Sequence, residues 1–77
     1  MREEELHAEA SRILKALLAR RQLKQADLAE ALSKIGIRES VSSIKGKLHR
    51  GTFSFAWMLA CCKVLGLSKV MLDDDGV

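Results

Sequence analysis

Apolar residues recur at three- and four-residue spacing in four successive segments of this chain, and no proline interrupts them. Proline breaks the interior of a helix and glycine weakens it. A chain of 77 residues with no proline and five glycines therefore favours helices joined by short turns. A chain of this length forms one small core. We predict an all-α fold in which residues 1–77 form a single compact four-helix domain.

The first two predicted helices cover residues 4–22 and 25–34. The acidic residues at the front of the first helix suit the positive end of its dipole. The buried stripe of the second helix consists of Leu28, Leu32 and Ile35. Gly36 follows at the position where a helix commonly ends with a left-handed residue.

The third predicted helix begins after a cap at Glu39 or Ser40 and runs to about His49. Its inner stripe consists of Val41, Ile44 and Leu48. The fourth predicted helix covers about residues 54–65 and ends before Gly66.

The fourth helix is apolar on all sides, so we expect it to be buried on more than one side, with a partner subunit as its second contact. The homodimer interface predicted in this way consists of Trp57, Ala60, Cys61, Val64 and Val70. Trp57 suits the core of a single chain as well. Residues 67–72 are expected to form a short strand or an extended arm on the core, and the acidic tail at residues 73–77 is expected to be flexible.

Basic residues are concentrated in the body of the chain. Residues 11–72 hold twelve Lys and Arg against three acids, which gives this segment a formal charge of +9, whereas the whole chain carries +3. A small domain with so basic a body is typical of polyanion binders. A solvated basic surface without a partner fits the same composition.

The two cysteines, Cys61 and Cys62, are adjacent and cannot cross-link two elements as a pair, which favours a reducing compartment. The two histidines lie at no ligand spacing typical of zinc, so we expect no metal and no cofactor. The N-terminus is acidic, and the longest apolar run, residues 55–62, is far shorter than the ~20 residues of a membrane span. We expect a cytoplasmic protein with no membrane contact.

The second and third predicted helices have the features of a DNA-binding pair. In a helix-turn-helix the second helix lies in the major groove, which requires a narrow apolar stripe, a polar outer face and small residues close to the DNA. The third helix meets these requirements with Ser42, Ser43, Gly46 and two lysines. A glycine inside a helix costs about 1 kcal/mol relative to alanine. Either a side chain at Gly46 would collide with DNA, or the glycine is tolerated or packs against another helix.

The segment Leu-Lys-Gln-Ala-Asp-Leu-Ala-Glu at residues 23–30 resembles the Leu-Thr-Gln-x-x-Leu-Ala pattern of the Cro/CI-type (xenobiotic-response-element) helix-turn-helix family. Arg50-Gly51 and an apolar helix ending Leu65-Gly66-Leu67 match the closing part of that family, so the resemblance covers about residues 12–67. The chain is still more similar to an uncharacterised bacterial branch of the superfamily. The matching residues are Arg20-Arg21, Ile35-Gly36, Glu39, Lys47, Arg50-Gly51, Phe53 and Cys61.

The resemblance implies a small bacterial, phage or plasmid transcriptional regulator, a repressor for example, that binds double-stranded DNA in a sequence-specific manner. It implies a phosphate contact for Gln25 and base or backbone contacts around the start of the third helix. The predicted DNA-binding residues are Arg20, Arg21, Gln25, Arg38, Ser40, Ser42, Ser43, Lys45, Gly46, Lys47, His49 and Arg50. The two adjacent arginines fit a solvated helix end equally, and His49 fits a surface or capping residue.

Three departures from the family pattern change the expected contacts. Lys24 replaces a capping threonine, the linker before the third helix is about three residues longer, and Gly46 replaces an asparagine of the closer branch. Two other functions fit the same fold: a protein-interaction module, such as an antitoxin or adaptor using the fourth helix, and a non-specific DNA or RNA binder. We expect no enzyme, because no catalytic constellation or phosphate-binding glycine loop is present.

Overall fold

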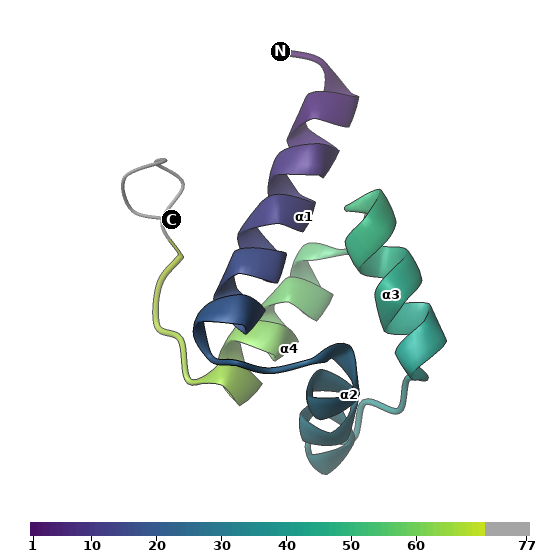
Figure 1. The fold of residues 1–77 in the computed structure, drawn as a ribbon, viewed down its shortest axis with the longest axis vertical. Coiled ribbons are helices and arrows are strands. Elements are labelled where there is room, and N and C mark those ends of the chain that lie inside the picture. Colours follow the sequence, from purple (N-terminus) through teal and green to yellow (C-terminus); the bar gives the residue numbers. More distant parts are fainter. Residues whose placement is uncertain (71–77) are drawn as a thin grey trace.

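A computed structural model describes residues 1–70 of the chain, and these form helices and no strand (Figure 1). The helices are α1 (Glu3–Arg20), α2 (Gln25–Lys34), α3 (Val41–Arg50) and α4 (Phe55–Leu65). The all-α prediction is confirmed, and α2 has the predicted bounds. The prediction of 4–22 for the first helix is wrong by one residue at its start and by two at its end.

The core lies where α3 packs against both α1 and α2, and where α2 packs against α4. Its buried apolar side chains are Ile13, Leu14, Leu17, Leu18, Leu28, Leu32, Ile44, Leu48, Trp57, Ala60 and Cys61. Burial of each large apolar side chain contributes about 1.5–3 kcal/mol relative to exposure. This core therefore holds the four helices in one domain.

Two residues of the predicted buried stripes are exposed instead. The side chain of Ile35 is 50% exposed, because α2 has ended and Gly36 turns the chain away with φ +89°. Ile37 takes its place against the core, and its N–H donates to the carbonyl oxygen of Leu32. Val41 is 39% exposed because it is the first residue of α3, and the residues of this helix that are buried in the core, Ile44 and Leu48, come later.

Gly51 ends α3 at the point where this helix crosses α1. Its φ of +68° lies in the left-handed region, and a Cβ atom at this position would overlap the carbonyl oxygen of His7 in α1. No other residue type fits both the conformation and the space. This glycine therefore sets how closely the end of α3 approaches α1.

Two side chains of the α1 segment satisfy the ends of other helices. The last carbonyl groups of a helix have no partner within that helix. The buried hydroxyl of Ser11 donates to the carbonyl oxygen of Leu48 in the last turn of α3. The guanidinium of Arg21 donates from Nε to the carbonyl oxygen of Leu65 at the end of α4, at 3.2 Å. These contacts tie α1 to both helices independently of apolar packing.

Residues 67–70 form neither helix nor strand, and Leu67 and Val70 pack against the core. For these four residues the structure agrees with an extended arm rather than a strand. The other expectations, for residues 71–72 and for the acidic tail at 73–77, lie outside the described residues. Among the helices of residues 1–70, none combines the length and the apolar character that a membrane crossing requires.

Candidate nucleic-acid interface

The outer face of α3 has residues with small side chains at its centre and basic residues at its edges. At 100° per residue, Gly46 lies opposite the buried Ile44 and Leu48, with Ser42 beside it. The side chains around this centre are exposed: Ser42, Lys45, His49 and Arg50. The guanidinium of Arg50 lies across Gly46, so that a Cβ at Gly46 would be 2.9 Å from Nη1 of Arg50.

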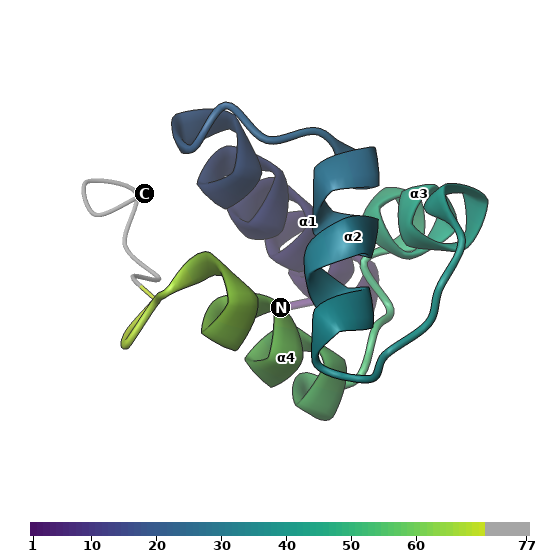
Figure 2. The same ribbon diagram turned by 90° about the horizontal axis from the view of Figure 1, so that it is seen from below.

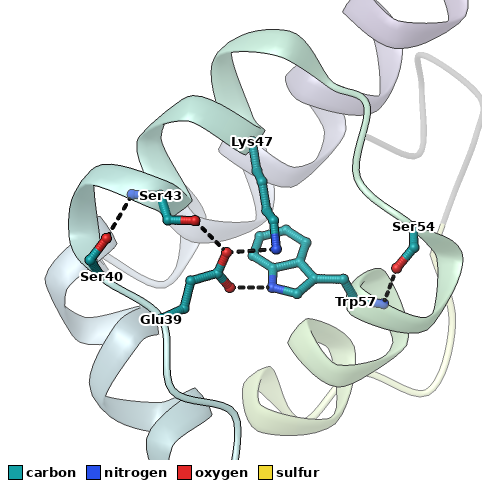
Figure 3. A network of polar contacts seen from close by, with 6 residues as sticks. All are labelled: Glu39, Ser40, Ser43, Lys47, Ser54 and Trp57. Atoms are coloured by element: carbon teal, nitrogen blue, oxygen red, sulfur yellow. Dashed lines mark hydrogen bonds and ion pairs between the residues drawn. The ribbon is translucent and has the colours of Figure 1, made fainter.

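The inner edge of α3 is fixed by one carboxylate, that of Glu39 in the linker before the helix (Figure 3). The Glu39 side chain is only 9% exposed, and Lys47 Nζ lies 2.6 Å from its Oε2. Ser43 Oγ donates to the same oxygen at 2.7 Å. Trp57 Nε1, on α4, donates to Oε1 at 2.7 Å. Both carboxylate oxygens are therefore occupied by partners on two different helices.

The aromatic ring of Trp57 extends this network. Lys47 Nζ lies 4.8 Å from the centre of the indole ring, within the range of a cation–π interaction. Trp57 also contacts the Phe53 ring, with a centroid separation of 5.2 Å. We name the group of Glu39, Ser43, Lys47 and Trp57 the Glu39 cluster.

The electrostatic state of the Glu39 cluster follows from these contacts. Burial raises the pKa of Glu39, whereas its three hydrogen-bond donors and the charge of Lys47 lower it. The net effect places this pKa below its ordinary value of 4.5. At neutral pH the carboxylate is therefore ionised and acts as an acceptor for all three donors.

This arrangement separates the predicted DNA-contacting residues of α3 into two groups. Ser43 and Lys47 belong to the Glu39 cluster, and the hydroxyl of Ser40 caps α3 by accepting from the N–H of Ser43 at 3.0 Å. The structure thus brings these three side chains into contacts within the chain. Ser42, Lys45, Gly46, His49 and Arg50 remain on the outer side.

The remaining predicted residues precede α3 in the chain. Figure 2 shows the end of α1, the start of α2 and all of α3 along the same side. Arg20 and Arg38 are exposed, and Gln25 is half-buried at the first position of α2. Arg21, in contrast, is bound to the end of α4, and its Nη1 donates to the carbonyl oxygen of Leu17 at 3.4 Å.

The start of α2 shows how the chain compensates for Lys24, which has no hydroxyl for capping. The carboxylate of Asp27 accepts from the N–H of Lys24 at 2.8 Å and also lies at the positive end of the helix. Asp27 thus satisfies the N–H of the N-cap residue, which is the other half of a capping box from the one that a threonine hydroxyl supplies. The first turn of α2 is therefore defined despite the substitution.

Three of the five predicted dimer-interface residues, Trp57, Ala60 and Cys61, are buried within the single chain. Their apolar character is accounted for by the core, and they present almost no surface to a partner. Val64 and Val70 are half-buried. Burial, together with nearby Cys62 and Glu39, raises the pKa of Cys61 to about 12, so this thiol is unreactive at neutral pH.

The sequence-based prediction missed Ser11 and the central position of Glu39. A signal for Ser11 exists, because it is a polar residue on the apolar face of α1, where a hydroxyl requires a partner. Glu39 was predicted as an alternative cap of α3 and as a match to the closer branch, without any role for its side chain between two helices. Within residues 1–70 no three His, Cys, Asp or Glu side chains come together in a way that could hold a metal ion.

Comparison with known proteins identifies the family of the chain but no activity. No curated protein and no solved structure matched the chain. A family model described as Domain of unknown function (DUF6471) matches residues 6–70, a range that includes α2, α3, α4 and most of α1. The chain belongs to this family.

Proposed function

We propose that the protein binds double-stranded DNA through the outer face of α3 and acts as a small transcriptional regulator. The observation that carries the proposal is the composition of this face, with Ser42 and Gly46 at its centre and Lys45, His49 and Arg50 around them. Small residues allow the helix to approach the floor of the major groove. Lysine and arginine donate to guanine edges or phosphates, and serine donates to either.

The rigidity of α3 supports the same proposal. A helix that discriminates between bases must be held in one orientation, because hydrogen bonds to base edges depend on geometry. The Glu39 cluster fastens the inner edge of α3 to α4, and Ser11 fastens its end to α1. The outer face is left for a ligand while the helix itself is held from two sides.

Charge supports a polyanionic partner. The segment of residues 11–72 carries +9, and Arg20 and Arg38 are exposed. In the proposed complex these arginines contact phosphates, as does Gln25 at the start of α2. Binding at a promoter would then exclude or recruit the polymerase.

The test is a fluorescence-anisotropy titration of two duplexes, one from the promoter region of the protein's own gene and one scrambled duplex of the same composition. Each is titrated at two salt concentrations. We expect tighter binding to the promoter duplex and a steep loss of affinity with salt, since each neutralised phosphate adds about 0.9 to the slope of log affinity against log salt.

The variant Lys45→Ala, compared with Lys63→Ala, tests the assignment to α3. Both variants remove one exposed lysine, but Lys63 lies on α4. A base contact by Lys45 is worth about 1–3 kcal/mol of discrimination. We expect only K45A to reduce the preference for the promoter duplex. Equal affinities of K45A and K63A for both duplexes would show that α3 is not the helix that recognises the DNA sequence. If the wild type bound neither duplex at low salt, DNA binding itself would be refuted.

The same titration, carried out at stoichiometric concentrations, tests the predicted homodimer. Two copies bound per duplex, with half-sites about 34 Å apart, are expected when two α3 helices occupy successive major grooves. One copy per duplex would show that a single chain is the binding unit.

A further inference from the structure

An apolar groove of about 580 Å³ lies between α1 and α4, and the segment of residues 67–70 forms its third wall. Figures 1 and 2 both show this segment on the side of α1 that faces away from α3. The volume lies within the range of small-molecule sites, about 300–1,000 Å³. The groove is therefore separate from the proposed DNA-binding face and large enough for a ligand.

The walls of the groove leave apolar surface exposed to water. Ile13 of α1 forms part of the lining, and the facing part of α4 contributes Phe55 and Leu59. The side chain of Phe55 is 76% exposed and that of Leu59 is 45% exposed. Exposed apolar surface that is gathered at one concave site is typical of a binding site.

The charged residues of this groove are all of one sign. Lys63 of α4 and Lys69 of the segment after it both belong to the lining, and no acidic residue does among the described residues. The hydroxyl of Ser68 is also part of the lining. Two ammonium groups beside an apolar groove are complementary to a ligand with an apolar body and an anionic head.

We propose that this groove binds a small amphipathic carboxylate of the medium-chain fatty-acid type. The alkyl chain lies against Ile13, Phe55 and Leu59, and the carboxylate interacts with Lys63 and Lys69. The proposal does not depend on DNA binding, because none of the α3 residues assigned to DNA lines the groove.

The test is a titration of the whole isotope-labelled chain with decanoate below its micellar concentration, followed by two-dimensional NMR, with decanol as the neutral probe of the same chain length. We expect saturable 1:1 binding of decanoate with shifts concentrated at residues 10–13, 55–62 and 67–70. Decanol is expected to bind more weakly. Equal affinity for the two probes, or shifts that appear only near the micellar concentration, would overturn the proposal.

Matched variants test each half of the site. Leu59→Gln removes apolar contact inside the groove, and we expect it to weaken decanoate binding about tenfold. Leu6→Gln is the control, because Leu6 is similarly exposed, at 49%, but does not line the groove. The double variant K63Q/K69Q is expected to weaken decanoate binding about three- to tenfold and to leave decanol binding unchanged. K45Q, on α3, is its control.

A second copy of the chain is the competing occupant of this groove. Sedimentation equilibrium of the wild type and of L59Q measures it directly. A wild-type dimer that dissociates in L59Q, together with no decanoate binding, would replace the ligand with a partner chain and overturn the proposal. A wild-type monomer that binds decanoate supports the ligand.

Discussion

At the scale of single residues, Glu39 has the most consequential environment described in this chain. Its carboxylate accepts hydrogen bonds from Ser43 on α3 and Trp57 on α4 and pairs with Lys47. Charge-assisted hydrogen bonds of this kind contribute about 1.5–3 kcal/mol each when both partners are present, and removal of one partner leaves the others unsatisfied. Substitution of Glu39 therefore affects two helices at once.

The stability of the domain is expected to fall in acid through Glu39. Because its pKa is lower in the folded state than in the unfolded state, the unfolded state binds more protons in acid. The stabilisation from Glu39 is present above about pH 4.5 and is lost as the pH falls through the lowered pKa. Urea unfolding from pH 7 to pH 3 measures this loss, with Trp57, the only tryptophan, as the fluorescent reporter.

The variant Glu39→Gln should unfold with about 1–3 kcal/mol less free energy at pH 7 and should show a shallower loss of stability in acid. Glu30→Gln, an exposed residue of α2, is the matched control and should retain the wild-type dependence. Identical pH dependences for E39Q and the wild type would show that Glu39 is not the titrating group.

Gly46 within α3 and Gly51 at its end are expected to respond to alanine in opposite ways. Gly51→Ala should lower the free energy of unfolding by more than about 2 kcal/mol, because it combines a left-handed backbone with overlap against His7. Gly46→Ala should raise it by up to about 1 kcal/mol, since only the mobile end of Arg50 must move. Chemical denaturation measures both. A destabilised G46A would mean that this glycine is required by packing rather than by a ligand.

At the scale of helices, the ends of α3 and α4 depend on α1. Ser11 donates to the last turn of α3 across 37 residues of sequence, and Arg21 donates to the end of α4 across 44. Carbonyl groups at helix ends are otherwise satisfied by water or by caps within the same helix. Hydrogen bonds require a defined geometry, so these two contacts favour one position of α3 and α4 relative to α1. Apolar packing is non-directional and defines this position less sharply.

Ser11→Ala should lower the free energy of unfolding by about 1–2 kcal/mol, because the carbonyl oxygen of Leu48 loses a buried donor. Ser33→Ala is the control, since its hydroxyl is exposed and donates only within its own helix, to Glu30. The control should change the stability by less than about 0.5 kcal/mol. Equal effects in the two variants would show that the contact between α1 and α3 adds nothing.

In the molecule as a whole, α3 lies on one side together with the end of α1 and the start of α2. The groove between α1 and α4 lies away from α3. The described core is small, as expected for 77 residues, so a few kcal/mol is a large part of its stability. The positive charge of the chain is concentrated in residues 11–72, the same segment that contains these apolar core residues. Repulsion among these charges therefore opposes folding.

We expect the melting temperature to rise by several degrees between 0.05 M and 0.5 M sodium chloride. Salt screens repulsion among the exposed basic residues, while the partly buried pair of Glu39 and Lys47 is screened less. Circular dichroism during heating measures the change. Lys45→Glu, which lowers the charge of α3, should reduce the salt effect. A melting temperature that falls with salt would show that attractive surface pairs dominate.

The helices of residues 1–70 could be predicted from sequence, because helix formation depends on local spacing of apolar residues and on local signals at the ends. The bounds of α2, the cap at Ser40 and the stop at Gly36 follow from residues within a few positions of each other. Ile35 and Val41 were placed wrongly because periodicity does not show where a helix leaves the core. The concentration of basic residues between positions 11 and 72 was equally evident from the sequence.

Which polar side chains remain available for a partner depends on how the helices pack against one another. Ser43 and Lys47 lie on the same helix as the residues that we propose to contact DNA, but Glu39 engages both of them. Arg21 is engaged at α4, and the apolar residues assigned to a dimer belong mostly to the core. The contacts of Trp57 with Glu39 and of Arg21 with Leu65 join residues that lie 18 and 44 positions apart, and they exist only once the helices have packed. A periodic pattern contains no information about such contacts.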